Sequence, residues 1–128
     1  MFYILGAMVF LQLLTGGLRV FGFIDEITHI TTGIITFILA VITLVAAGLT
    51  KPRYRPSMAI SALMVVLIFI QALIGFSFDN SSGIIPNTNG LIFLHFTNAL
   101  IIYAVAISGV LMAMRWSKMT TAIPPKQP

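Results

Sequence analysis

Four long apolar runs dominate the sequence and limit what the chain can fold into. They cover about residues 2–20, 24–49, 58–78 and 91–114. Each has the roughly 20 residues that an α-helix needs to cross the hydrocarbon core of a bilayer. Only 8% of the residues are charged, against roughly a quarter in soluble domains, so the chain cannot cover a water-facing surface. We therefore predict an all-α membrane protein, a four-helix transmembrane bundle in contact with the lipid bilayer.

The segments between the runs mark the ends of the predicted helices. Residues 51–56 form a basic turn with two helix-stopping prolines. Residues 79–90 are rich in Asn, Ser and Gly, which is typical of a loop. The first run lacks the basic start and the small-residue cleavage site of a signal peptide, so we expect it to be retained as a helix. A single transmembrane domain then covers residues 1–118, and residues 119–128 form a Pro-rich, flexible cytoplasmic tail.

Charged residues are distributed unequally between the two sides of the predicted bundle. Six of the seven basic residues lie on the side of the 51–56 turn and the C-terminus. Arg19 is the exception, and the acidic residues Asp25, Glu26 and Asp79 lie on its side. The positive-inside rule predicts a multi-pass protein of the cell membrane with both termini in the cytoplasm. The net charge of +4 forms no basic patch among aromatic residues, so we exclude nucleic acid as a partner.

The chain contains an internal repeat. Residues 12–16 (QLLTG) in the first run and 71–75 (QALIG) in the third both read Q-x-L-x-G. Residues 29–35 and 95–101, in the second and fourth runs, share the pattern H-x-T-polar-small-aliphatic-I. The offsets are 59 and 66 residues, and the matches occur in the same order. Chance similarity between apolar segments is the alternative, but we favour two parallel helical-hairpin repeats related by a pseudo-twofold axis along the membrane normal.

His29 and His95 are the only histidines in the chain, and both lie near one edge of the membrane. His29 precedes Lys51 by 22 residues, and His95 precedes Arg115 by 20. At about 1.5 Å per residue, both lie roughly 30–33 Å from the basic face of the bundle. Since they occupy equivalent positions of the repeat, we expect them to face each other across the bundle axis. Ionisable residues inside a membrane are functional candidates; the alternative is that each imidazole binds water or a carbonyl at the headgroup level.

Two facing imidazoles in a chain without cysteine favour haem over other metal groups. The absence of cysteine excludes disulfides, thiolate metal sites and iron–sulfur clusters. Zinc usually takes three or four protein ligands, whereas haem iron needs one or two axial ligands from the protein. Bundle interiors are common cofactor sites. We therefore predict that His29 and His95 are metal ligands of a haem iron.

Small residues follow each histidine by one helical turn. Gly33 and Ala99 lie four positions after His29 and His95, on the same helix faces. Such residues would let a flat macrocycle approach the backbone, so we take both as cofactor-binding candidates. The glycines of the two Q-x-L-x-G motifs flank the same level. The alternative for these glycines is close packing of helices in lipid.

Several polar side chains lie near the histidines. Glu26 is three positions before His29, and it either belongs to the site or stabilises the start of its helix through the helix dipole, as we expect for Asp25. Arg19 either binds an acidic substituent of the haem or pairs with Glu26 or Asp25. We expect the glutamines of the two Q-x-L-x-G motifs to donate interhelical hydrogen bonds, and lining the site is the alternative.

These motifs resemble those of haem A synthases. The resemblance rests on an E-x-x-H element, a Q-x-L-x-G stretch, a G-x-x-R helix end, and a histidine with a small residue four positions later. In this chain they are Glu26 with His29, residues 71–75, Gly16 with Arg19, and His95 with Ala99. The resemblance covers nearly the whole chain, which corresponds to one four-helix half of the usual eight-helix family member.

The resemblance implies a specific chemistry. Haem A synthases oxidise the methyl group of haem O to the formyl group of haem A, with haem b as cofactor. By this resemblance His29 and His95 bind the iron of haem b, and Glu26 is the catalytic carboxylate beside the substrate. A catalyst that needs two haems implies a homo-oligomer of this short chain, and haem O synthase or a terminal oxidase would be its partner in respiratory oxidase assembly.

Two other functions remain open at this point. The chain could be a b-type cytochrome or an accessory subunit of a respiratory complex, which passes electrons without substrate chemistry. It could also be a structural membrane subunit without a cofactor.

Overall fold

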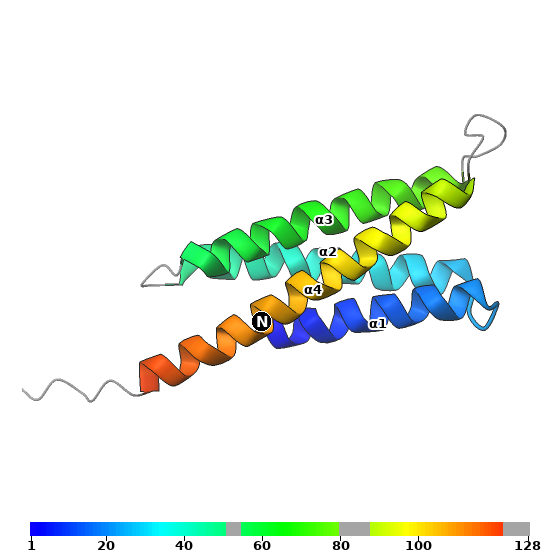
Figure 1. The fold of residues 1–128 in the computed structure, drawn as a ribbon. Helices are drawn as coiled ribbons and strands as arrows, with labels where there is room; N and C mark the ends of the chain where they lie inside the picture. The colour runs from blue at the N-terminus through cyan, green and yellow to red at the C-terminus, as the bar shows by residue number, and fades with distance from the viewer. Residues whose placement is uncertain (51–54, 80–87, 122–128) are drawn as a thin grey trace, which may run out of the picture.

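The structure is a computed structural model that describes residues 1–50, 55–79 and 88–121. The chain forms four α-helices (Figure 1), which are α1 (Phe2–Val20), α2 (Glu26–Leu49), α3 (Arg55–Asp79) and α4 (Thr88–Thr121). Each of them is long and apolar enough to cross a membrane. The predicted all-α class and the four predicted spans are therefore confirmed within the described residues.

The helix bounds differ from the predicted spans mainly in α3 and α4. α3 begins at Arg55, which places Pro56 in the first turn, where proline is tolerated. α4 continues to Thr121, well beyond the apolar run that ends near residue 114, because residues 115–123 contain no proline or glycine. The first three residues of the predicted tail are therefore helical. Residues 122–128 and 80–87, which carry the rest of the predicted tail and most of the predicted loop, lie outside the described residues.

A tight turn at the end of α1 sets the geometry of the first hairpin. Gly22 adopts a positive φ of 75°. Its N–H donates to the Arg19 carbonyl at 2.9 Å, and the N–H of Phe23 donates to the Leu18 carbonyl at 2.9 Å. This is the Schellman pattern, which uses glycine because the left-handed conformation disfavours a side chain. The chain reverses within a few residues, so α2 begins beside the end of α1.

Asp25 caps the start of α2. Its carboxylate accepts a hydrogen bond from the Thr28 backbone N–H at 2.8 Å, which satisfies one of the helix's unpaired donors. Hydrogen bonding from Thr28 lowers the pKa of the Asp25 carboxyl below its ordinary value. The predicted helix-opening role of Asp25 is confirmed.

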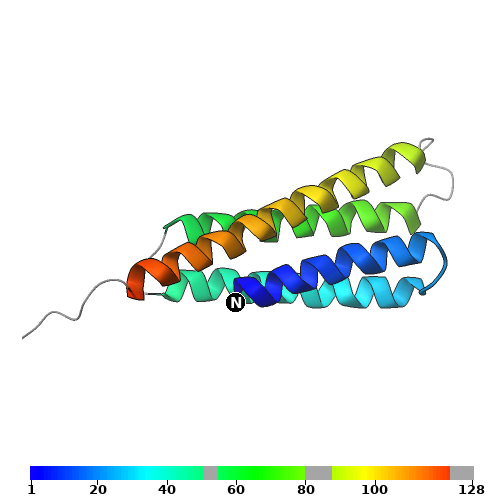
Figure 2. The same ribbon diagram turned by 60° about the horizontal axis from the view of Figure 1, so that its bottom comes forward.

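The helices form a bundle in which each one packs against two neighbours. α1 packs against α2 and α4, and α3 packs against the same two helices. Within the described residues, α2 and α4 therefore lie diagonally opposite, as do α1 and α3. Figures 1 and 2 show the two antiparallel hairpins, α1–α2 and α3–α4, side by side. This arrangement is compatible with the predicted pair of hairpin repeats, and it places the two histidine-bearing helices across the bundle from each other.

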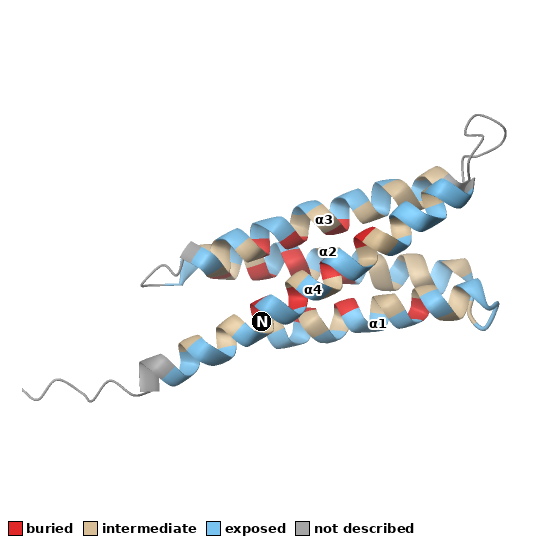
Figure 3. Ribbon diagram, in the orientation of Figure 1, coloured by how far each residue is buried: buried red, intermediate tan, exposed pale blue. Residues whose placement is uncertain are grey.

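The two halves of the bundle have different interiors. We call residues 12–36 of the first hairpin and 71–99 of the second the histidine half, and the remainder the terminal half. The fully buried apolar cluster lies in the terminal half, and it consists of Leu5, Val9, Ala40, Met64, Ile68, Ile102 and Ala106. In the histidine half the buried residues that the structure describes are all polar, namely Thr15, Thr36 and Asn98 (Figure 3). The hairpins also diverge toward this half (Figure 1).

Candidate functional site

Each histidine lies against the glycine of its own hairpin. A Cβ atom on Gly16 would be 3.1 Å from Cε1 of His29, and one on Gly75 would be 3.4 Å from Cε1 of His95. Because glycine has no side chain, each imidazole can approach the backbone of the neighbouring helix. The glycines of the two Q-x-L-x-G motifs therefore make room for the imidazoles in this structure.

The two imidazoles meet between the hairpins. Their ring centroids are 6.5 Å apart and their planes are inclined by 64°. Since α2 and α4 lie diagonally opposite, this contact crosses the bundle axis. His29 and His95, which the sequence predicts to lie at equal depth and to face each other, are therefore in contact in the structure. The rings meet edge to face, because each is oriented by its own hairpin.

A glutamine joins the two helices of each hairpin beside the histidine. Nε2 of Gln12 donates to the His29 carbonyl at 3.2 Å, and Nε2 of Gln71 donates to the His95 carbonyl at 3.0 Å. The predicted interhelical role of both glutamines is confirmed, and in both hairpins their target is the backbone of the histidine.

The glutamine oxygen is also bonded equivalently in both hairpins. Oε1 of Gln12 accepts from the Thr32 hydroxyl at 2.6 Å, and Oε1 of Gln71 accepts from the Asn98 amide at 2.7 Å. Thr32 and Asn98 each lie three positions after a histidine, at the polar position of the repeat. The similarity of the two hairpins therefore extends from the sequence to matched hydrogen bonds, which join each histidine-bearing helix to its neighbour.

Gly33 lies against the Gln12 side chain. A Cβ atom on Gly33 would be 3.1 Å from Nε2 of Gln12, so this glycine leaves space for the amide that bonds the His29 carbonyl. Ala99 stands at the equivalent position of the second hairpin. Both small residues lie one turn from a histidine, as expected, and Gly33 contacts the other helix of its own hairpin.

Thr15 contacts the ring of His29. Its side-chain oxygen Oγ1 lies 3.2 Å from Nδ1 of His29 and donates to the Gln12 carbonyl at 3.1 Å. Thr15 is 7% exposed, so water does not readily replace these contacts. The equivalent position in the second hairpin is Ile74, whose side chain has no hydrogen-bonding group.

Arg19 and Glu26 form an ion pair at the end of the first hairpin. Nη2 of Arg19 lies 2.8 Å from Oε2 of Glu26, and the two side chains are 37% and 40% exposed. Of the alternatives that the sequence leaves open for Arg19, the structure contains the pair with Glu26. Glu26 begins α2, so its carboxylate also lies at the helix end where negative charge is favourable.

Thr15, Thr32 and Asn98 belong to the site although the sequence did not single them out as site residues. Signals for them were present. Thr15 follows Gln12 by three positions and so shares its helix face. Thr32 and Asn98 occupy the polar position that follows the shared threonine in both copies of the histidine motif. A polar residue at a matched position of two apolar helices indicates a hydrogen bond inside the bundle.

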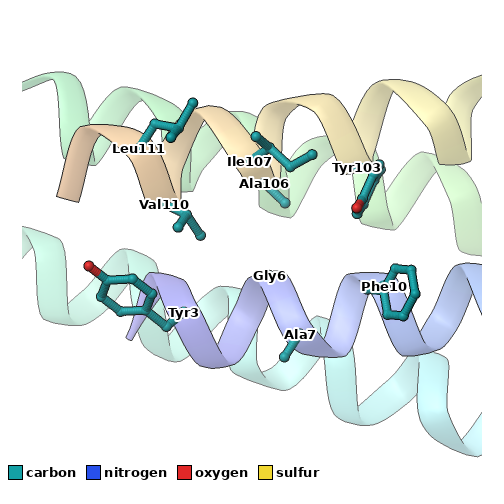
Figure 4. Close-up of a pocket in the computed structure, with 9 residues that line it drawn as sticks. All are labelled: Tyr3, Gly6, Ala7, Phe10, Tyr103, Ala106, Ile107, Val110 and Leu111. Carbon is teal, nitrogen blue, oxygen red and sulfur yellow. The ribbon is translucent and has the colours of Figure 1, made fainter. Parts of the chain in front are cut away.

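A separate groove lies between α1 and α4 in the terminal half (Figure 4). Its volume is about 210 Å³, and it is lined by Tyr3, Gly6, Ala7, Phe10, Tyr103, Ala106, Ile107, Val110 and Leu111. The lining is apolar apart from the two tyrosine hydroxyls. Its α1 residues precede Gln12 and its α4 residues follow Ala99, so the groove is distinct from the histidine pair.

The donor groups of the site are the two imidazoles. Within residues 1–50, 55–79 and 88–121, no three side chains of His, Cys, Asp or Glu come together in a way that could hold a metal ion. Comparisons of the chain with protein-family models, with curated proteins and with solved structures found no match.

Proposed function

We propose that this chain is a haem-binding membrane oxidoreductase in which His29 and His95 are the axial ligands of one iron. The observation that carries the proposal is the distance of 6.5 Å between the two ring centroids. A metal–imidazole bond is about 2 Å long, so two imidazoles on opposite sides of one metal ion have centroids roughly 6 Å apart. The pair therefore has the spacing of two ligands to a shared ion.

The chemistry of the donor set favours haem. Haem iron takes one or two ligands from the protein and its other ligands from the macrocycle, so the two imidazoles would be enough to hold it. A zinc site would need one or two further protein ligands. A haem bound in this way supplies a one-electron couple.

The surrounding residues hold the two ligands. Gly16 and Gly75 let the imidazoles approach the neighbouring helices. The glutamine bonds fix each histidine along its helix. We retain Gly33, Ala99 and Arg19 as cofactor-binding residues because all three lie within one or two turns of a histidine, in sequence or across the hairpin.

The resemblance to haem A synthases narrows the proposal to oxidation of the methyl group of haem O, with haem b as cofactor. By that resemblance, Glu26, which lies one turn before His29, is the catalytic carboxylate. On the same resemblance, we propose that the chain forms a homo-oligomer and that it associates with haem O synthase or a terminal oxidase.

A second candidate is a b-type cytochrome or a respiratory accessory subunit that passes electrons without substrate chemistry. The ion pair between Arg19 and Glu26 favours this candidate. A carboxylate bonded to a guanidinium at 2.8 Å already has a structural role at the end of the hairpin, so a catalytic role is not needed to explain it.

An absorption spectrum of the purified protein tests haem binding. We expect a sharp α band in the reduced protein, and we expect its loss in His29→Ala and in His95→Ala. Phe96→Ala is the matched control, because Phe96 neighbours His95 on α4 but is 57% exposed. An unchanged band in both histidine variants would contradict the proposal.

Haem analysis separates the two candidates. A synthase that is expressed with haem O available should yield haem A or its hydroxylated intermediate, and Glu26→Gln should abolish this product while the haem b spectrum remains. Recovery of haem b alone from cells that supply haem O, with no effect of Glu26→Gln, would instead establish the electron carrier.

The charge distribution supports the proposed orientation in the cell membrane, with both termini in the cytoplasm. Because the chain has no cysteine, a single introduced thiol reports the side on which it lies. We expect Ser81→Cys to react with an impermeant reagent added to intact cells, and Lys126→Cys to react only after permeabilisation. The opposite labelling pattern would show that both termini lie outside the cytoplasm, which would contradict the proposed orientation.

A further inference from the structure

The hydroxyl of Thr15 lies between a backbone carbonyl and a ring nitrogen of His29. It is 3.1 Å from the Gln12 carbonyl oxygen and 3.2 Å from Nδ1 of His29. Thr15 is buried. Its oxygen is also 3.5 Å from the Thr32 hydroxyl oxygen, which has a shorter bond of its own to Oε1 of Gln12 at 2.6 Å. A hydroxyl has one proton to donate and lone pairs with which to accept, so the direction of one of the two shorter contacts fixes the direction of the other.

The direction of the two bonds follows from where the hydroxyl proton lies. The proton on Oγ1 of Thr15 can go to the Gln12 carbonyl or to Nδ1 of His29. The contact with the carbonyl is the shorter of the two and is the usual bond of a threonine inside a helix, so we assign the proton to it. The oxygen then presents a lone pair to His29, and Nδ1 of His29 must carry the hydrogen. Nε2 then carries the lone pair that a metal needs, and in this structure the Gln12 amide is a donor to it at 3.4 Å.

We infer that Thr15 is a positioning residue that holds His29 in the tautomer with hydrogen on Nδ1, so that Nε2 is its only metal-binding atom. The statement about metal binding rests on the proposed function, whereas the tautomer itself does not. The Gln12 amide does not select a tautomer, because it lies almost equally far from the two ring nitrogens, at 3.3 and 3.4 Å. The Thr15 hydroxyl therefore selects the tautomer of His29.

With Thr15 in this role, His29 and His95 would be unequal ligands of the proposed haem iron. A hydrogen bond from the distal ring nitrogen makes an imidazole a stronger ligand and fixes the orientation of its ring. The first hairpin supplies this bond through Thr15, and the equivalent residue of the second hairpin, Ile74, cannot supply one. A stronger imidazole donor favours the oxidised iron, so removal of the hydroxyl should raise the midpoint potential of the bound haem.

Nitrogen NMR of the haem-free protein tests the tautomer directly. In protein labelled with ¹⁵N-histidine in detergent micelles at neutral pH, we expect His29 to carry its hydrogen on Nδ1. Thr15→Val should shift His29 toward the other tautomer, and Thr15→Ser should preserve the wild-type pattern. The signals of His95 are an internal control, and they should not change.

A matched variant controls for the loss of a buried hydroxyl. Thr43 is 2% exposed and its hydroxyl donates to the Leu39 carbonyl within α2, so Thr43→Val should leave His29 unchanged. A hydrogen on Nε2 in the wild type, or the same tautomer in Thr15→Val as in the wild type, would overturn the inference. If Thr15→Val does not fold, the wild type and Thr15→Ser still decide.

The haem-loaded protein provides a second measurement. We expect a higher midpoint potential in Thr15→Val, by about 59 mV for each tenfold loss of ferric relative to ferrous affinity, and no shift in Thr43→Val. A potential in Thr15→Val equal to or below the wild-type value would overturn the ligand role. If the wild type binds no haem but His29 carries hydrogen on Nδ1, the proposed function fails while the assigned tautomer stands.

Discussion

The two hairpins hold their histidines by the same contacts but surround them with different chemistry. In both, a glycine faces the imidazole and a glutamine bonds the histidine carbonyl. The first hairpin adds the Thr15 hydroxyl and the Arg19–Glu26 ion pair. At the corresponding positions the second hairpin has Ile74, Phe78 and Ile92.

The contacts that both hairpins share position the imidazoles, whereas the contacts found only in the first hairpin change the chemical environment of His29. The contacts that occur twice fix the height and the approach of each ring, which both halves of a shared site need equally. The contacts that occur once give the first hairpin polar and charged groups near its histidine. On the proposed function, any substrate chemistry or adjustment of the haem potential belongs to the first hairpin.

The largest difference between the hairpins should appear when alanine replaces their glycines. In Gly16→Ala the new methyl group would lie 3.1 Å from a ring that Thr15 holds, whereas in Gly75→Ala it would make an ordinary contact at 3.4 Å. Overpacking costs about 1–3 kcal/mol, while alanine in place of helical glycine gains up to about 1 kcal/mol.

We therefore expect Gly16→Ala to weaken haem retention and to destabilise the bundle, and Gly75→Ala to be neutral or stabilising. Detergent-titrated unfolding and the haem content of the purified variants measure both effects. Equal losses in the two variants would show that Thr15 does not hold the His29 ring.

Replacement of the glutamines tests the equivalence of the hairpins. Gln12→Leu and Gln71→Leu each remove a hydrogen-bonded bridge between two membrane helices. Such bonds contribute about 0.6 kcal/mol on average and up to about 1.7 kcal/mol. We expect similar losses of unfolding free energy in the two variants, because Thr32 and Asn98 each keep another acceptor. A loss confined to one hairpin would contradict the matched role of the glutamines.

Conversion of the ion pair tests whether the first hairpin needs its charges for stability. The double variant Arg19→Phe with Glu26→Ile gives this hairpin the residues of the second one. Since the pair is more than one-third exposed, we expect a change of only about 0.2–1 kcal/mol in unfolding free energy. We expect a lower haem content as well, because Arg19 is proposed to bind the cofactor. An unchanged haem content would remove Arg19 from the residues that hold it.

The smallest effect concerns the cap of α2 and its dependence on pH. Because the pKa of the Asp25 carboxyl is lowered in the folded protein, its cap contributes stability above the ordinary aspartate pKa of about 3.9 and loses it as pH falls through the lower folded value. We expect the Thr28 amide signal to titrate below the ordinary aspartate range. Asp25→Asn, which still caps a helix, should abolish this titration. A midpoint at or above the ordinary value would contradict the cap.

Much of the fold and part of the site could be predicted from the sequence. Apolar length determines the four spans, and the repeat together with equal depth brings His29 and His95 together. The sequence did not predict that Thr15 contacts a ring nitrogen or that Gly33 faces Gln12. Those contacts depend on how far each helix is rotated about its axis, which the packing of all four helices decides. The sequence also did not predict that α4 extends to Thr121, because hydropathy indicates the part of a helix that crosses the lipid and not the residue at which the helix ends.

The central claim is that one iron is shared by imidazoles from both hairpins. The spin state of the ferric protein, measured by electron paramagnetic resonance together with the ratio of haem to chain, tests this claim most directly. We predict one haem per chain with a low-spin signal in the wild type, and conversion to high spin when either histidine is replaced by alanine. A low-spin signal that persists in His29→Ala or His95→Ala, or one haem for every two chains, would contradict it.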